Sequence, residues 1–357
     1  MPTMTSVAKR AGVAVSTVSY ALNGTRPISE ETRQRIFKAI EELGYKPHAL
    51  ARGLASKRSR IIALLFPNTD RGLGFTELEF VTSAANAAKE NQYSLVLWSY
   101  DVHDLNELRQ LTQQRLVDGV VVMEVHEHDA RIDMLRQIEF PFSMIGRSAN
   151  MDGLDYVDID FSQTVRDAVD HLVELGHTEI AFVNQSRTAF EAGYGPVVRT
   201  QAAFEQIMAE RSHDPIARFC RTELRAGYDA FNALLDERPD LTAIITMNER
   251  AVPGMLHAIH ERDWSVPDDM SLVVIVTSST IGEMMIPPLT TLEAKTVGMG
   301  RIGVELLINQ LEGRPQEQSQ ILLPCHLVVR RSTGPRPARA RALARAQRQE
   351  AAPSSTR

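Results

Sequence analysis

The chain has 357 residues, more than one hydrophobic core usually serves, so two or three domains are expected. Its 43% hydrophobic and 24% charged residues are typical of a folded α/β protein. No apolar run approaches the roughly 20 residues of a membrane span, and the N-terminus lacks the order of a signal peptide. These features predict a cytoplasmic protein without a membrane partner.

The sequence offers little support for an enzyme, a metal site or a bound cofactor. Its two cysteines, Cys220 and Cys325, show neither CxxC nor Cys/His spacing, and we expect both to be buried as small apolar residues. The His-Glu-His stretch at 126–128 and the pair His257 and His260 lack a third ligand at a known spacing, which favours solvated surface histidines. P-loop and GxSxG motifs are absent from the sequence.

Charge is distributed unevenly along the chain. Residues 1–60 carry 11 Lys and Arg against 4 Asp and Glu, and residues 331–357 carry 7 Arg against 1 Glu. Because the whole chain has a net charge of −6, the body between these segments must carry −19. A basic head attracts nucleic-acid phosphates while an acidic body repels them. A merely solvated basic surface would explain the charge alone equally well.

The first two predicted helices are short and amphipathic, with Gly12 placed to end the first. Each is too short to be stable alone, so they must pack together, in a helix-turn-helix pattern. Their apolar positions are Val7, Ala8 and Ala11 in the first segment and Val15, Val18 and Leu22 in the second.

A third helix is predicted between Ser29, as its N-cap, and Gly44, with an apolar stripe formed by Ile36, Ala39, Ile40 and Leu43. The second helix keeps polar residues outside its stripe, and short hydroxyl side chains suit contacts with phosphates and base edges. A generic three-helix bundle would need the apolar spacing but not these residues, which are Ser16, Thr17, Ser19 and Tyr20.

The stretch "SVAKRAGVAVSTVSYALNGTRPISEETRQRIFKAIEELGYKPHALARGLASKRS" resembles the DNA-binding head and hinge of the lactose-repressor (LacI/GalR) family of bacterial transcription regulators. The resemblance implies a helix-turn-helix head over 1–46 and a hinge helix or linker over 47–60. It implies base reading by Val15, Ser16 and Tyr20, and further DNA contacts by Thr5, Thr17, Ser19, Asn23 and Arg26.

One departure from the family concerns the start of the recognition helix. Ala14 stands where the family usually has a serine N-cap. Loss of such a cap typically costs about 1 kcal/mol. We therefore predict a head that is less well ordered in the absence of DNA.

The predicted hinge has good helical propensity but few apolar groups to bury within one chain. In the family this helix pairs with its twin from a second subunit, and the residue matching Leu54 wedges into the central minor groove of a palindromic operator. Two such wedges kink a base step and admit more protein contact. A plain linker is the alternative. The hinge residues expected at the DNA are Ala51, Arg52, Leu54 and Lys57.

From Ile61 onwards, short apolar runs alternate with amphipathic segments, which predicts an α/β body with parallel sheets. Strands are predicted at 61–66, 94–98, 119–123, 142–146, 179–183, 243–247 and 271–276. The resemblance implies a periplasmic-binding-protein-like body of two Rossmann-like lobes. The implied boundaries are 61–160 with 291–323 for the N-terminal lobe and 161–290 with 324–333 for the C-terminal lobe.

Polar effectors of such bodies bind beyond the carboxyl ends of the strands. Motifs that match the family make Asp160, Arg199 and Asn248 the expected effector contacts, because together they offer a carboxylate, a guanidinium and an amide. A surface ion pair for Arg199 and strand-end caps for the other two are the alternatives. Phe75 and Trp98 could stack on a sugar face, although core packing is favoured for both.

The body departs from the family pattern where an effector-binding aspartate is usual. The stretch "SLVVIVTSS" places Val276 at that position, and an apolar side chain cannot accept hydrogen bonds from sugar hydroxyls. Ala202 also replaces a common glycine, and Glu249 replaces the usual aspartate after Asn248. These changes weaken the case for a sugar effector.

The tail over 334–357 is rich in Arg and Ala and is expected to be disordered, with weak nonspecific DNA affinity as one potential role. It lacks the leucine heptads that make some family members tetramers, which favours a homodimer. The sequence thus predicts a DNA-binding transcription regulator, a repressor controlled by a small molecule such as a sugar. A non-sugar effector, no effector, or a solute-binding protein without a DNA role are the alternatives.

Overall fold

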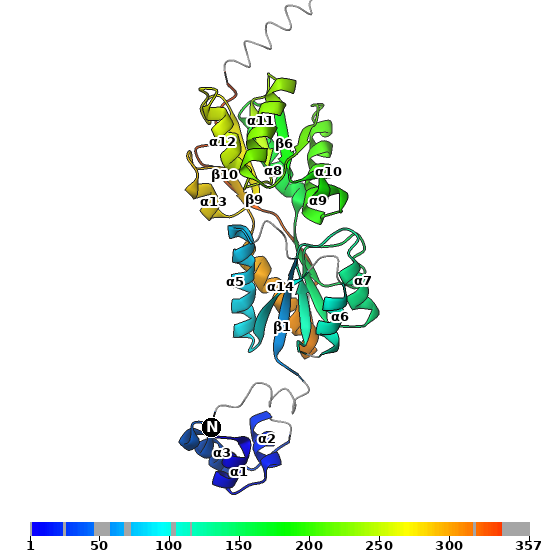
Figure 1. Cartoon of the computed structure of the whole chain (residues 1–357), viewed down its shortest axis with the longest axis vertical. Coiled ribbons are helices and arrows are strands. Elements are labelled where there is room, and N and C mark those ends of the chain that lie inside the picture. Colours follow the sequence, from blue (N-terminus) through cyan, green and yellow to red (C-terminus); the bar gives the residue numbers. More distant parts are fainter. Residues whose placement is uncertain are drawn as a thin grey trace, which may run out of the picture.

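The computed structural model describes residues 2–23, 26–45, 58–67, 73–100, 105–114, 116–316 and 319–337. Within these residues the chain forms a small helical head followed by an elongated body of two α/β lobes (Figure 1). The predicted fold class is therefore confirmed. The predicted hinge contacts at 51–57 and the tail beyond residue 337 lie outside the described residues.

The head consists of α1 (Met4–Ala11), α2 (Val15–Asn23) and α3 (Glu30–Leu43). Gly12 and Gly44 end α1 and α3 in the left-handed conformation, with φ of 68° and 58°, and the Ser29 side chain accepts a hydrogen bond from Thr32 N at the start of α3. A small core joins the three helices and explains why segments this short are stable together. Its buried members are Val7, Ala8, Ala11, Val18, Ile36, Ala39 and Tyr45.

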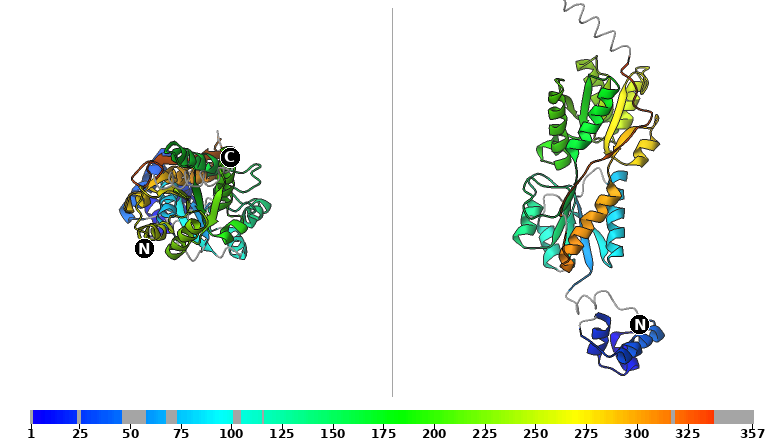
Figure 2. Two further views of the ribbon diagram at one scale, coloured as in Figure 1. Left: turned by 90° about the horizontal axis from the view of Figure 1, so that it is seen from above. Right: turned by 180° about the vertical axis from the view of Figure 1, so that it is seen from behind.

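The N-terminal lobe is a six-stranded sheet in the order β11-β5-β4-β3-β1-β2, in which all neighbouring strands are parallel. Helices cover both faces, with α5 beside α14 on one face (Figure 2). Its elements are β1 (Ile61–Pro67), α5 (Phe75–Glu90), β2 (Ser94–Tyr100), α6 (Leu105–Gln113), β3 (Gly119–Val122), α7 (Ala130–Gln137), β4 (Phe142–Ile145), β5 (Tyr156–Ile159), α14 (Thr296–Glu312) and β11 (Gln320–Leu323).

The C-terminal lobe repeats this plan with the strand order β12-β10-β9-β8-β6-β7, in which β12 alone among the described strands runs antiparallel to its neighbour. Its elements are α8 (Phe161–Glu174), β6 (Ile180–Asn184), α9 (Arg187–Glu191), α10 (Gly195–Glu210), β7 (Ile216–Phe219), α11 (Leu224–Glu237), β8 (Ala243–Thr246), α12 (Val252–His260), β9 (Ser271–Thr277), α13 (Ser279–Met284), β10 (Thr290–Glu293) and β12 (His326–Val328).

The chain passes between the lobes three times, after β5, after β10 and after β11. Because β10 pairs with β9, the second passage follows Glu293 and not residue 290, where the sequence placed it. The seven predicted strands all exist, whereas the strands β5, β7, β10, β11 and β12 were not predicted.

Both cysteines are buried, as expected. Among the described helices, none is both long and apolar enough to cross a membrane.

Candidate DNA-binding face and effector cleft

The first turn of α2 is the exposed part of the head. Val15 is 42% exposed, Ser16 is exposed, and Thr17 is half-buried, whereas Val18 is fully buried and fixes the helix on the core. The placement of Val15 in the apolar stripe was therefore wrong. The periodicity that buries Val18 turns the start of the helix towards solvent, where an apolar side chain is free to contact a thymine methyl group.

The other predicted head contacts surround this turn. Thr5 is exposed on α1, and Ser19 and Tyr20 are half-buried on α2. The guanidinium carbon of Arg26 lies 5.2 Å from the centre of the Tyr20 ring, an arrangement that orients the cation. The side chain of Asn23 lies outside the described part of the structure.

The chain enters the body through a fixed set of contacts. Ser59 N and Arg60 N donate to the two oxygens of Asp118, over 2.7 and 2.8 Å. Arg60 also lies 3.0 Å from Glu312 at the end of α14, and Arg58 donates to Leu311 O over 2.6 Å. Any rotation of the N-terminal lobe is therefore transmitted to the residues that follow the hinge.

A cleft of about 120 Å³ lies between the lobes, at the carboxyl ends of both sets of parallel strands. This volume is below the roughly 300–1,000 Å³ of typical ligand pockets, so the lobes must part to admit a molecule of sugar size. The described lining residues that carry polar side chains are Thr76, Glu77, Glu124, Asp158, Gln185, Tyr194, Thr222, Asn248, Glu249 and Arg250.

Asn248 is held rigidly in the cleft wall. Its amide nitrogen donates to Cys220 O and Arg221 O, over 3.0 and 3.2 Å, and these two carbonyl acceptors fix which way the amide points. The residue is 1% exposed, and its Oδ1 atom has no hydrogen-bond partner in the described part of the chain. A buried acceptor left in this state favours a ligand that donates a hydrogen bond.

Glu249 joins the two lobes across the cleft. Its Oε2 atom accepts hydrogen bonds from Thr277 in the C-terminal lobe, over 2.6 Å, and from Thr76 in the N-terminal lobe, over 3.1 Å. Burial, together with the nearby charge of Glu77, raises the pKa of this carboxyl. The glutamate that replaces the usual aspartate thus ties the lobes together.

Arg199 forms a second link between the lobes. From α10 it donates to Arg147 O over 2.7 Å and lies 3.5 Å from Asp158 Oδ2, while Arg147 lies 3.3 Å from the same oxygen. Burial raises the pKa of Asp158 to about 6, against the lowering effect of the two guanidinium groups. Asp158 lines the cleft, and Arg199 stands behind it.

The backbone closes the same side of the cleft. Glu127 N donates to Gly193 O and Gly195 N donates to Val125 O, which forms an antiparallel bridge between His126 and Tyr194. Gly195 is required here, because a Cβ atom would lie 3.0 Å from Val125 O and 2.4 Å from the Arg199 guanidinium. The described structure is therefore a closed form of the two lobes.

Besides Arg199, three predicted effector residues lie away from the described cleft lining. Asp160 accepts a hydrogen bond from Gln163 N as the N-cap of α8, over 3.0 Å. Phe75 is 50% exposed at the start of α5, and Trp98 packs against the core of the N-terminal lobe. The plainer alternative describes Asp160 as a helix cap and Trp98 as a core residue, whereas Phe75 is too exposed for the core packing that was its alternative.

Comparisons with known proteins agree with this architecture. Residues 3–48 match the model for bacterial regulatory proteins of the lacI family, and residues 169–333 match a periplasmic binding protein-like domain. The HTH-type transcriptional regulator DegA of Bacillus subtilis is 30% identical over 93% of this chain and 98% of its own length. The chain belongs to the LacI family of bacterial regulatory proteins.

Two solved structures of LacI-family regulators resemble the whole chain. The lac repressor dimer bound to operator and the anti-inducer ONPF is 25% identical, with a TM-score of 0.77 over 93% of this chain and 99% of that one. The complex of the transcriptional regulator CelR with cellobiose is 27% identical, with a TM-score of 0.68 over 93% of this chain and 100% of that one.

Val276, the departure from the LacI-family pattern, lines the cleft in a strained conformation. Its φ is 57°, and it is the extra residue of a bulge, because Ile275 and Thr277 pair with the consecutive residues Leu292 and Glu293. Left-handed backbone suits Asp, Asn and Gly but is unusual for a β-branched residue. The bulge thus fits the aspartate that the family usually has here better than it fits valine.

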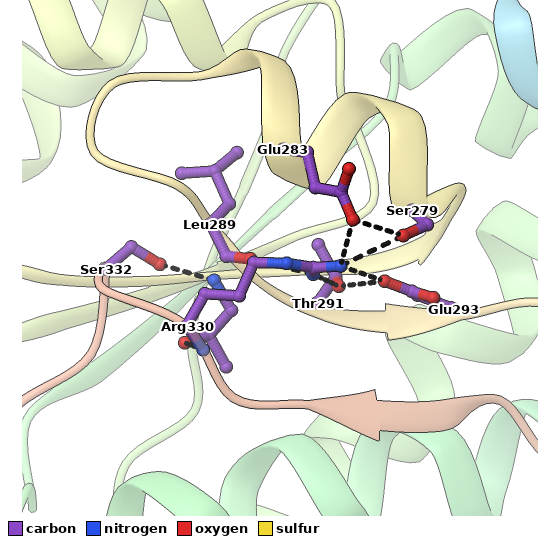
Figure 3. Close-up of polar contacts among 8 residues, drawn as sticks. Ser279, Glu283, Leu289, Thr291, Glu293, Arg330 and Ser332 are labelled. Carbon is purple, nitrogen blue, oxygen red and sulfur yellow. Dashed lines mark hydrogen bonds and ion pairs between the residues drawn. The ribbon is translucent and has the colours of Figure 1, made fainter.

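The segment after Val276 is anchored by Arg330 (Figure 3). This half-buried guanidinium donates to Thr291 Oγ1, Ser279 Oγ and Glu293 Oε1, over 2.6, 3.1 and 2.8 Å. It therefore links the start of α13 and strand β10 to the segment that follows β12. This anchor limits how far the strained bulge can relax.

Sequence reasoning missed several cleft residues of this LacI-family chain. Asp158 lies in β5, whereas Asp160, two positions later, follows the strand and is taken by the start of α8. Thr76 and Glu77 open α5 and reach the cleft as a helix N-terminus. In the sequence, Thr76 and Glu77 stand between apolar residues of an amphipathic segment, and nothing there indicates that they reach a cleft.

Proposed function

We propose that this LacI-family chain is a cytoplasmic, homodimeric repressor that binds a palindromic operator and is released by a small effector, a sugar or sugar derivative. The observation that carries the proposal is the presence, in one chain, of an exposed basic helix-turn-helix and a two-lobe cleft. A solute-binding protein needs the cleft and not the head, so this alternative is disfavoured.

The operator contacts follow from the exposed face of the head. Val15 and Ser16 point outwards from the first turn of α2 and read bases, while the hydroxyl groups around them meet the backbone. Thr5, Thr17, Ser19, Tyr20, Asn23 and Arg26 complete this face, and Ala51, Arg52, Leu54 and Lys57 act from the hinge.

Release by an effector follows from the closed cleft. A ligand of sugar size must part the lobes, which breaks the bridges of Glu249 and Arg199 that hold them together. The N-terminal lobe then rotates, and the contacts of Asp118 with Ser59 and Arg60 carry this rotation to the hinge. Two misaligned hinges weaken both half-site contacts at once.

A dimer interface is supported by exposed apolar side chains on one flank of the body, where α5 and α13 lie (Figure 1). Monomeric proteins seldom expose apolar residues in groups. The residues concerned are Phe75 and Leu78 on α5, Met284 at the end of α13, and Ile286, which is 89% exposed.

Asn248 and Val276 remain the proposed effector contacts, joined by Asp158 and Glu249. We assign Arg199 the role of holding Asp158 in place and closing the lobes. A sugar is favoured by the cellobiose bound to the similar regulator CelR and by the unpartnered Asn248 Oδ1 atom. Val276, which accepts no hydrogen bond, favours the alternative of a less polar effector.

The test measures operator affinity by fluorescence anisotropy, with and without a panel of mono- and disaccharides. Sedimentation of the complex gives the number of chains bound to each operator. The proposal predicts two chains per operator and one compound that lowers affinity at least tenfold. Val276→Asp, tested on the same panel, should widen the set of active sugars. A protein that binds no palindrome, or binds it as a monomer, would contradict the proposal.

A further inference from the structure

A hollow that belongs to neither the DNA-binding face nor the effector cleft lies at β7, the outermost strand of the C-terminal sheet. Its described lining contains three arginines and no carboxylate, although residues 61–330 carry a net charge of −19. Such a local reversal of charge attracts anions. The lining residues are Arg187, Ala217, Arg218, Phe219, Cys220 and Arg221.

The guanidinium groups are positioned but only weakly neutralised. Arg187 lies over the Phe219 ring, with its guanidinium carbon 4.6 Å from the ring centre. Arg218 pairs with Glu237 through Nη2, yet its Nε atom is buried and has no hydrogen-bond partner in the described part of the chain. A buried donor of this kind needs an acceptor.

Arg221 is held still less firmly. Its Nε atom lies 3.8 Å from Glu223, and both side chains are more than half exposed. Exposed ion pairs contribute little and are easily exchanged for a better partner. The carboxylates that contact Arg218 and Arg221 belong to Glu237 and Glu223, and neither residue is in the described lining of the hollow.

We propose that this hollow binds a small oxyanion, inorganic phosphate or a phosphate monoester, through Arg187, Arg218 and Arg221. Guanidinium groups present paired N–H donors that match the oxygens of phosphate. A tetrahedral dianion satisfies the Arg218 Nε donor and offers further oxygens to the two flanking arginines. Neutral sugars lack the charge that three guanidinium groups require.

This site shares a wall with the effector cleft. Cys220 and Arg221 line the hollow, and their carbonyl oxygens accept the two hydrogen bonds that hold Asn248 in the cleft. An anion that fixes this segment therefore fixes Asn248 as well. Linkage is reciprocal, so phosphate in the hollow and effector in the cleft alter each other's affinity by the same factor.

The test is isothermal titration of the full chain with inorganic phosphate and, separately, with glucose 6-phosphate, in a phosphate-free buffer of low ionic strength. The double variant Arg187→Gln/Arg218→Gln should lose at least about tenfold in affinity, since hydrogen bonds to charged groups are the strong ones. Arg225→Gln is the matched control, because Arg225 is an exposed arginine of the same lobe that pairs with Asp229.

Saturable binding that the double variant loses and the control keeps supports the site. Equal binding by wild type and double variant places the anion on the basic head or tail and overturns the proposal, as does the absence of saturable binding. If the double variant does not fold, Arg221→Gln replaces it, because that side chain is 74% exposed. Operator binding is measured separately, so failure here leaves the proposed repressor role untouched.

Discussion

The head and the effector cleft are specified by the sequence in different ways. The head is built from contacts among residues 4–45, which are close together in the sequence. Its helix caps and its turn can therefore be predicted from short stretches of neighbouring residues. The cleft is assembled from residues far apart in sequence, such as Thr76 with Glu249 and Asp158 with Arg199. Substitutions in the head should therefore change DNA binding alone, and substitutions in the cleft should change stability and control.

The largest effect is expected at the exposed turn of α2. Ser16→Glu places a carboxylate against the DNA phosphates and base edges, and should reduce operator affinity at least about 100-fold without changing the fold. Fluorescence anisotropy with a labelled operator measures this loss. Gln137→Glu, an exposed residue on the N-terminal lobe with the same change of charge, should bind as the wild type does. An equal loss in both variants would show that only net charge matters.

The hinge should act on specificity. Leu54→Ala removes the apolar wedge, and should reduce specific operator affinity by about tenfold or more while nonspecific affinity changes little. Titrations with operator and with a scrambled duplex at the same salt concentration give the two values. Equal losses on both duplexes would rule out the wedge.

In the cleft, Arg199→Ala should lower the free energy of unfolding by about 3 kcal/mol, because the buried Asp158 carboxylate then loses one of its two neighbouring guanidinium groups. It should also shift the effector response to lower effector concentrations while the head still binds DNA, because one of the bridges that the effector must break is already gone. Urea denaturation and the anisotropy assay measure the two effects. Arg166→Ala, which removes a half-exposed pair with Glu210, should cost under about 1 kcal/mol. An unchanged induction curve for Arg199→Ala would refute its role.

Asp158 should make stability depend on pH. The pKa of Asp158 is raised from a value near 3.8 to about 6 in the folded protein. Its stabilising contribution to the free energy of unfolding is therefore fully present below pH 3.8 and is lost as the pH rises through 6. Relative to Asp158→Asn, the wild type should lose on the order of 2 kcal/mol between pH 4 and pH 7. Denaturation at several pH values tests this.

The smallest effect concerns the strained bulge. Val276→Gly relieves the left-handed conformation of a β-branched residue and should stabilise the protein by about 1 kcal/mol. The midpoint of urea denaturation reports the change. Val273→Gly, in the same strand but fully buried, should destabilise the protein instead. A Val276→Gly variant that is less stable than the wild type would show that side-chain packing outweighs strain there.

The same contrast explains what could be predicted from the sequence. The helix ends at Gly12 and Gly44 and the cap at Ser29 are local signals, and the structure shows all three. Apolar strands such as β3 were also predictable, whereas β5 and β10 carry polar residues within the strand, among them Asp158 and Glu293. In the cleft, Asp158 and Asp160 stand two positions apart, and only the fold decides which of them caps α8.

The most direct test of the central claim, that this LacI-family chain reads DNA with the head and senses ligands with the cleft, is a footprint on the DNA flanking its own gene. Wild type, Ser16→Glu and Arg199→Ala are compared with and without the sugar panel. The account predicts a protected palindrome for wild type that one compound abolishes, no protection with Ser16→Glu, and, with Arg199→Ala, protection that the same compound abolishes at a lower concentration. Protection by Ser16→Glu equal to that of the wild type would contradict it.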